Sequence, residues 1–169
     1  MTETVYLGLG SNLGDRERFL NRAVARLKDL EGLEVVAISA IYTSPAQETT
    51  DNSPAFLNRV LKGEYAFGPT ELLNAVEKIE SELGRDGKGE RRARTIDIDI
   101  LLFGLHQTKT DRLEIPHPRL TKRAFVLVPL LEIDPELIHP VSGKPLAKYL
   151  TPAGRTQIEI FRDHVARQV

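Results

Sequence analysis

The chain has 169 residues, a length that favours one folded domain, and 41% of its residues are hydrophobic while 28% are charged. The formal net charge is -1, which argues against a protein that works mainly by coating nucleic acid or an anionic membrane. Cysteine is absent, so disulfides, thiolate catalysis and zinc–thiolate sites are excluded. No apolar run approaches the roughly 20 residues of a membrane span. The N-terminus lacks the form of a signal peptide, so a cytoplasmic protein is expected. We also expect a monomer.

The first part of the chain alternates between strand and helix patterns. Short runs rich in β-branched and other apolar residues predict strands over 4–9, 33–42, 56–65 and 95–103. A turn is expected at 10–12, and the polar stretch 43–54 is expected to be irregular. Apolar residues at helical spacing predict one helix that Asp15 caps and a second that Pro69 opens and Gly84 closes.

The remaining patterns are weaker. Residues 108–115 are expected to form an edge strand, 123–131 a short helix, 135–152 an irregular segment, and 157–161 a last strand. The resulting order, β-α-β-β-α-β with an appended segment, is typical of a ferredoxin-like α+β fold. We therefore expect a single domain over 1–169, with a largely antiparallel sheet and helices packed on it.

Two aspartates lie close together in the predicted strand 95–103. Because side chains alternate in a strand, Asp97 and Asp99 share one face with Leu101 and Phe103, and the isoleucines and Leu102 share the other. The two carboxylates lie about 7 Å apart and repel each other by roughly 2 kcal/mol at an effective dielectric of 20. They either face water and nearby arginines, or hold a hard cation such as Mg²⁺ together with phosphate oxygens.

The segment just before these aspartates favours the second interpretation. Residues 85–94 carry five basic side chains against two acidic ones, and glycines at 84, 87 and 89 make the segment flexible. Arginines and a metal beside one another neutralise charge during phosphoryl transfer. The alternative is a charged loop that is simply solvated. The position of residues 85–94 next to the aspartates favours a basic lid over the phosphates.

Several ordered blocks together resemble the 6-hydroxymethyl-7,8-dihydropterin pyrophosphokinase family over nearly the whole chain. The blocks lie at 6–14, 42–45, 56–58, 79–80 with 84–85, 94–101, and 115–119 with 123–125. The resemblance implies transfer of the β,γ-diphosphate of ATP to the pterin hydroxymethyl oxygen, with release of AMP.

The resemblance also implies a role for particular residues. Asp97 and Asp99 match the pair that holds two Mg²⁺ ions. The catalytic arginines match Arg85 and Arg94. Contacts with ATP are implied for Glu80, His117 and Arg123. The pterin is expected to lie between Phe56 and Phe125 and to meet Asn58 and the backbone near Ser44.

The chain departs from the family pattern in places. The loop before the aspartates reads Arg91-Arg92-Ala93-Arg94 and is one residue shorter, which weakens the alignment of Arg85. A loop tryptophan of some relatives is missing, since the chain has none. Phe56 and Pro118 stand where some members carry tyrosine.

A binding module on the same fold is the alternative class of function. An RNA-binding sheet needs a K/R-G-F/Y-G/A-F-V-x-F/Y pattern and a basic face, and the sequence has neither. A regulatory ligand domain would not need two aspartates beside an arginine-rich loop. An inactive relative that only binds the same ligands is a further alternative. An assay of AMP release from Mg-ATP distinguishes it from an enzyme.

Overall fold

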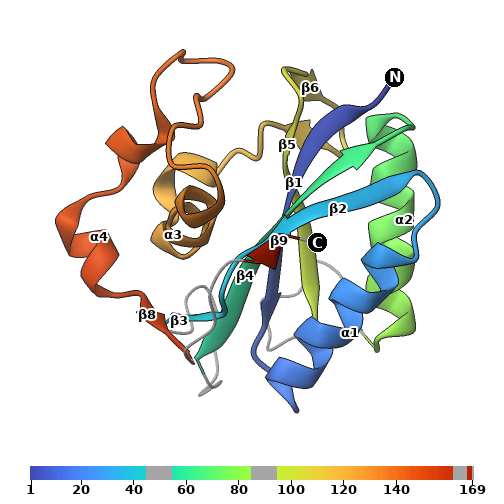
Figure 1. Cartoon of the computed structure of the whole chain (residues 1–169), viewed down its shortest axis with the longest axis horizontal. Helices are drawn as coiled ribbons and strands as arrows, with labels where there is room; N and C mark the ends of the chain where they lie inside the picture. The colour runs from blue at the N-terminus through green and yellow to red at the C-terminus, as the bar shows by residue number, and fades with distance from the viewer. Residues whose placement is uncertain (45–54, 85–94, 162–166, 169) are drawn as a thin grey trace.

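A twisted antiparallel sheet forms the centre of the molecule in the computed structural model (Figure 1). The structure describes residues 1–44, 55–84, 95–161 and 167–168. The main strands are β1 (Glu3–Ser11), β2 (Leu33–Ile38), β3 (Tyr42–Ser44), β4 (Phe56–Tyr65) and β5 (Asp97–Phe103). The longer helices are α1 (Arg16–Lys28), α2 (Pro69–Glu82) and α3 (Ala124–Ile133).

The strand order β5-β1-β4-β2 gives the sheet its topology. Each neighbouring pair is antiparallel, and helices α1 and α2 provide the two crossover connections. This is the order of a split β-α-β sheet, so the expected ferredoxin-like α+β fold is confirmed.

Helices α1 and α2 cover one face of the sheet and bury its larger core. The predicted cap is present, because the Asp15 side chain accepts a hydrogen bond from the backbone N–H of Arg18. Helix α2 begins at Pro69 as expected, and Gly84 follows its end with a φ of +91°, a conformation that glycine adopts without steric cost. Among the described residues, no helix is long and apolar enough to cross a membrane.

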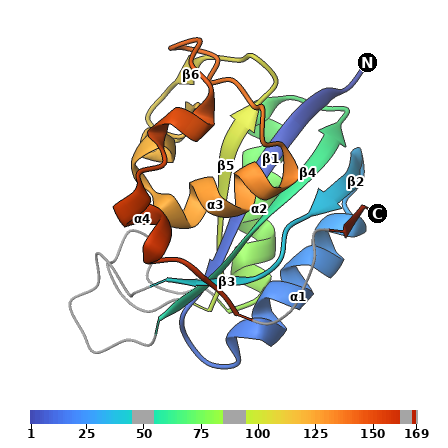
Figure 2. The same ribbon diagram turned by 60° about the vertical axis from the view of Figure 1, so that its left-hand side comes forward.

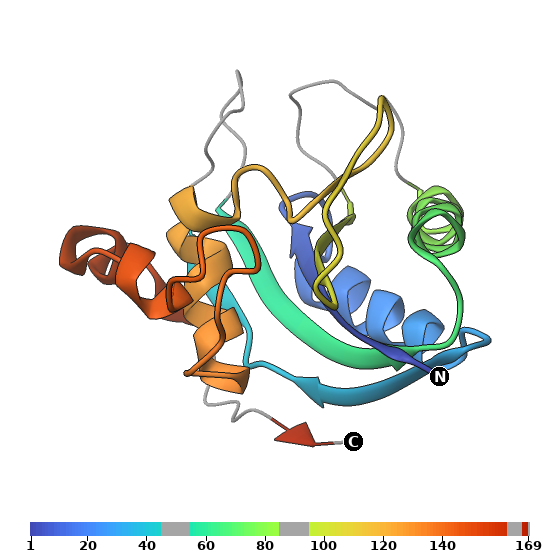
Figure 3. The ribbon, with the colours of Figure 1, turned by 90° about the horizontal axis from the view of Figure 1, so that it is seen from above.

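Helix α3 lies across the opposite face of the sheet (Figures 2 and 3). It buries a second core of nine residues: Tyr6, Val60, Leu101, Leu102, Leu120, Val126, Leu127, Leu130 and Leu146. The helix starts and ends within two residues of the expected bounds. This second layer is the part of the fold that places α3 beside the sheet residues described below.

The expected single strand over 33–42 is wrong, because two strands, β2 and β3, form there. The chain breaks at Ser39, whose Oγ accepts from the N–H of Val60 at 2.9 Å and whose carbonyl accepts from the Arg59 guanidinium at 2.7 Å. Side chains thus replace ladder partners at the break. The expectation of irregular structure from 43 onward is also wrong for residues 43 and 44, which lie in β3; residues 45–54 lie outside the described residues.

The strict alternation expected along 95–103 is wrong at its end. The pairing of β1 with β5 shifts between Tyr6, opposite Leu102, and Leu7, opposite Ile100, so Leu101 is an extra residue. A bulge of this kind turns the following side chains over. Leu102 therefore packs beside Leu101 under α3, and Phe103 packs in the core of α1 and α2.

The second half of the chain differs from the predicted elements in three places. Residues 108–115 form a separate hairpin, β6 (Thr108–Lys109) with β7 (Glu114–Ile115), instead of one edge strand. A short 3₁₀ turn, η1 (Leu120–Lys122), precedes α3. The run 135–152, expected to be irregular, contains a second 3₁₀ turn, η2 (Leu146–Tyr149). Pro152 begins α4 (Pro152–Thr156).

The end of the chain returns to the sheet. The expected strand over 157–161 is shorter, β8 (Glu159–Ile160), and pairs with β3. The short β9 (Arg167–Gln168) pairs with β2.

Candidate active site

Four strand ends meet at one end of the sheet. In the pairing register, Gly10 near the end of β1 lies opposite Asn58 on one side and Asp97 on the other. At the end of β3, Ser44 lies opposite Phe56, the first residue of β4. Figure 3 shows the first turn of α3 near this same end. Residues that are far apart in the sequence are therefore neighbours here.

Asp97 and Asp99 project from β5 on the face that α3 covers. Both are partly exposed, while the isoleucines that alternate with them are buried against α1 and α2. Their partners on β1 are Gly10 and Gly8, which have no side chain to cover the carboxylates. Two partly exposed carboxylates suit a hard divalent cation that also binds substrate phosphates. Among the described residues, no group of three His, Asp or Glu side chains is placed to hold a metal ion.

His117 lies beside the second aspartate. Its Nε2 is 3.9 Å from Oδ2 of Asp99, a distance that makes an ion pair when the imidazole is protonated. Its Nδ1 accepts a hydrogen bond from the N–H of Arg119 at 3.1 Å, so the neutral ring carries its proton on Nε2. Its own backbone N–H bonds to the carbonyl of Leu101 at 3.0 Å, which fixes the loop against β5. His117 therefore presents a donor on the side of Asp99.

Glu80 is buried beneath the same strand, with 5% of its surface exposed. Its Oε2 accepts a hydrogen bond from the backbone N–H of Ile98, the residue between the two aspartates, at 2.8 Å. The carboxylate thus holds β5 to α2 at the point where the aspartates project. Its expected contact with ATP stays a prediction.

Ser44 on β3 and Asn58 on β4 form a buried polar pair on the other side of β1 from the aspartates. The Asn58 amide donates to Oγ of Ser44 at 2.7 Å, and both side chains are at least 95% buried. A Cβ added at Gly10 would lie 3.2 Å from Oδ1 of Asn58 and 3.5 Å from the Phe56 ring. The Asn58 amide and the Phe56 ring therefore pack closely against the backbone of Gly10.

The start of α3 supplies an aromatic ring and a cation. Phe125 is partly exposed in the first turn, and the Arg123 guanidinium lies 5.4 Å from the centre of its ring. The two predicted catalytic arginines, Arg85 and Arg94, and the predicted lid 85–94 lie outside the described residues.

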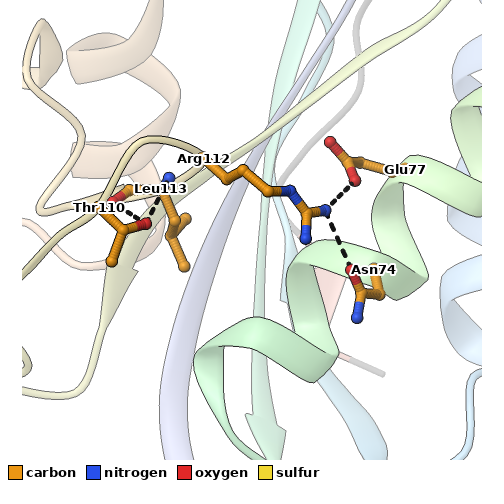
Figure 4. A network of polar contacts seen from close by, with 5 residues as sticks. All are labelled: Asn74, Glu77, Thr110, Arg112 and Leu113. Atoms are coloured by element: carbon orange, nitrogen blue, oxygen red, sulfur yellow. Dashed lines mark hydrogen bonds and ion pairs between the residues drawn. The ribbon is translucent and has the colours of Figure 1, made fainter.

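The hairpin that leads to His117 is fastened to α2 by contacts that the sequence pattern did not reveal. Arg112 donates from Nη2 to Glu77 at 2.6 Å and to Asn74 at 3.1 Å (Figure 4). Within the turn, the N–H of Leu113 bonds to Oγ1 of Thr110 at 3.1 Å. The two contacts of Arg112 join residues more than 30 positions apart, which no local pattern indicates.

A hollow of about 460 Å³ opens beside His117, between the hairpin and the segment before α4. The polar side chains that line it include Lys109, Thr121, His139 and Tyr149. Burial lowers the pKa of His139.

Comparison with known proteins identifies the chain's relatives. Residues 6–135 match the family described as 7,8-dihydro-6-hydroxymethylpterin-pyrophosphokinase (HPPK). The chain is 45% identical over 146 residues to the 2-amino-4-hydroxy-6-hydroxymethyldihydropteridine pyrophosphokinase of Aquifex aeolicus, covering 86% of this chain and 89% of that protein. It is 41% identical over 133 residues to the enzyme of the same name from Bacillus subtilis, covering 79% of each.

Longer proteins contain the same region. The folic acid synthesis protein fol1 of Pneumocystis carinii is 41% identical over 147 residues, which cover 87% of this chain and 20% of that protein. A crystal structure of Plasmodium falciparum HPPK-DHPS has the same fold, with a TM-score of 0.69 and 15% identity, over 88% of this chain and 45% of that chain. On its sequence match and its fold, this chain belongs to the 7,8-dihydro-6-hydroxymethylpterin-pyrophosphokinase family.

Proposed function

We propose that the end of the sheet where β1, β3, β4 and β5 meet is the active site of this pyrophosphokinase. The chain is a 2-amino-4-hydroxy-6-hydroxymethyldihydropteridine pyrophosphokinase: it transfers a pyrophosphoryl group from ATP to hydroxymethyldihydropterin in folate biosynthesis. The observation that carries the placement is the pair Asp97 and Asp99, which lies opposite two glycines, with Oδ2 of Asp99 3.9 Å from Nε2 of His117.

Two Mg²⁺ ions fit the carboxylate pair, because Mg²⁺ binds through one or two carboxylates and completes its shell with substrate phosphates and water. When bound, the ions neutralise charge on the phosphate oxygens. Asp97 and Asp99 would hold them. Glu80 would keep the two carboxylates in place through the backbone of Ile98, and His117 would donate from Nε2 to a phosphate oxygen.

The pterin would lie on the other part of the site. A flat polar heterocycle needs aromatic faces and in-plane hydrogen-bond partners. Phe56 and Phe125 supply the rings, Asn58 and the backbone near Ser44 supply the polar partners, and Arg123 stands beside Phe125 for ATP phosphates. Arg85 and Arg94 complete the proposal on the resemblance alone, as cations that stabilise charge in the transition state.

We also propose that the protein is a monomer and that it works in the cytoplasm, as expected from the sequence. No nucleic-acid or membrane partner forms part of the proposal. A second subunit is not needed to complete the aspartate pair or the Ser44–Asn58 pair.

The test of the site is AMP release from Mg-ATP with and without hydroxymethyldihydropterin. Asp97→Asn and Asp99→Asn should each lower kcat by about a hundredfold or more, because a carboxamide lacks the charge that the metal requires and several kcal/mol of stabilisation is lost. Glu82→Gln, which removes an exposed carboxylate from α2, is the control and should keep the parent rate. Turnover within a few-fold of the parent in both aspartate variants would refute the assignment.

A further inference from the structure

Two tyrosines tie the end of α3 to the sheet through carboxylates. Tyr6 of β1 donates its hydroxyl proton to Asp134, which also pairs with Nζ of Lys62 at 2.9 Å. Tyr42 of β3 donates its hydroxyl proton to Glu132. The two contacts have the same chemistry and come from Glu132 in α3 and Asp134 just after its end, but they reach different strands.

The carboxylate of Glu132 has a second role at the break between β2 and β3. The backbone N–H of Ala40, a residue that is 1% exposed, donates to both oxygens of Glu132 at 3.2 and 3.1 Å. A buried N–H needs an acceptor, and here the acceptor comes from α3 instead of from a neighbouring strand. Glu132 therefore binds both the backbone of Ala40, just before β3, and the side chain of Tyr42, the first residue of β3.

Strand β3 carries one wall of the proposed pterin pocket. It has only three residues, in which Tyr42 lies opposite Asn58 and Ser44 lies opposite Phe56. Movement of so short a strand would move Oγ of Ser44, which accepts the Asn58 amide at 2.7 Å. The other wall is Phe125, in the first turn of α3. The contact of Glu132 with Tyr42 and Ala40 thus joins the element that carries one wall to the element that carries the other.

We propose that Glu132 and Tyr42 are positioning residues for the pterin, which keep the ring of Phe125 in register with the Ser44–Asn58 pair. This inference rests on the proposed function, because it takes that pocket as the pterin site. The contact of Tyr6 with Asp134 fixes α3 to β1 and leaves β3 untouched. It is therefore a matched contact without the positioning role.

The experiment compares Tyr42→Phe with Tyr6→Phe in the full chain. Each variant loses one hydroxyl that bonds to a carboxylate, so both should lose thermal stability to a similar extent. Tyr42→Phe should raise the Kd and KM for hydroxymethyldihydropterin by about fivefold or more, the scale of coupling between linked sites. The KM for ATP should change by less than twofold, because the aspartates and His117 are held by other contacts. Tyr6→Phe should leave the pterin Kd within twofold of the parent.

Substitution of the carboxylate gives a second measurement. Glu132→Ala removes both acceptor oxygens, whereas Glu132→Gln keeps one carbonyl oxygen for Ala40 or Tyr42. The pterin Kd should therefore rise more in Glu132→Ala than in Glu132→Gln. If both variants are compared at the same concentration of folded protein, a smaller rise with glutamine supports positioning through the hydrogen bond.

The possible failures are distinct. A parent protein that does not bind the pterin, or that binds it equally well after Phe56→Ala, overturns the proposed site and the inference with it. A parent that binds normally, with equal pterin Kd values in Tyr42→Phe and Tyr6→Phe, overturns the positioning role alone. A rise in the KM for ATP equal to that for the pterin also overturns it, because the change would then reflect general loosening.

Discussion

Gly10 shows how a single residue shapes the site at the level of atoms. Its missing side chain leaves the space that the Asn58 amide and the Phe56 ring fill, and a Cβ there would lie 3.2 Å from Oδ1 of Asn58. A Cβ added at Gly8, two residues earlier on β1, would instead lie 3.3 Å from the side chain of Leu101. The two glycines are thus alike in strand and spacing but differ in what surrounds them.

Gly10→Ala is expected to weaken pterin binding selectively. The amide and ring must shift by a few tenths of an ångström, and misplacement of a positioning group lowers affinity and rate by roughly tenfold or more. KM for the pterin should rise, while KM for ATP stays near the parent value, in steady-state assays of AMP release. Gly8→Ala is the comparison for the pterin KM, because a Cβ at Gly8 would meet Leu101 instead of Asn58 and Phe56. Equal effects of the two substitutions on the pterin KM would contradict the role of Gly10.

The sequence was informative about residues whose role depends on local pattern. Alternation placed Asp97 and Asp99 on one face of a strand, and the cap at Asp15 followed from its position before an apolar stripe. Glu80 and Glu132 were not recognisable as backbone acceptors. Each accepts from an N–H at least 18 positions away, and only the packing of a helix on the sheet creates that contact.

Helix α3 illustrates the element scale, where the sequence indicated the element but not its attachment. Its existence followed from the apolar run, yet its contact with the sheet through two carboxylates required the strand order. The break between β2 and β3 was missed for a similar reason. Ser39 and Ala40 lie in a run of β-branched and apolar residues, and the groups that interrupt the ladder, Arg59 and Glu132, come from distant elements.

Asp134 makes the attachment of α3 dependent on pH. Burial alone would raise the pKa of this carboxyl group, but hydrogen bonds from Tyr6 and Lys62, with the charge of Lys62, outweigh burial and lower it. A pKa below its unfolded value means that the carboxylate stabilises the fold above the unfolded pKa. That stabilisation is lost as pH falls through the folded pKa.

Asp134→Asn should therefore lower the free energy of unfolding by roughly 1.5–3 kcal/mol at pH 7, the scale of a hydrogen bond to a charged group. The difference from the parent should stay constant down to about pH 5 and shrink below about pH 4, near the unfolded pKa of aspartate. Denaturant unfolding of both proteins at a series of pH values measures this difference in the free energy of unfolding. The exposed Asp111→Asn serves as the control, and a difference for Asp134→Asn that grows as the pH falls would contradict the sign.

At the scale of the whole molecule, the site depends on the sheet topology. The order β5-β1-β4-β2 brings the end of β1 between the starts of β4 and β5, so residues from positions 10, 58 and 97 become neighbours. Helix α3 then closes the open face. The β-α-β-β-α-β pattern predicted this sheet, whereas the hairpin β6–β7 and its attachment to α2 through Arg112 followed from side-chain contacts outside the pattern.

Because the proposed metal sites lie between the sheet and the phosphates, ligand binding should stabilise the whole fold only when Mg²⁺ is present. A ligand at 100 times its Kd stabilises a protein by about 2.7 kcal/mol. For a chain of this length that corresponds to a rise in Tm of roughly 5–10 °C. Thermal unfolding with ATP and Mg²⁺ should show this rise, and a chelator should remove most of it. Asp97→Asn should lose the Mg²⁺-dependent part, whereas Asp111→Asn should keep it. If ATP raised the Tm equally with and without Mg²⁺, in the parent and in Asp97→Asn alike, the aspartates would not hold a metal that bridges to the nucleotide.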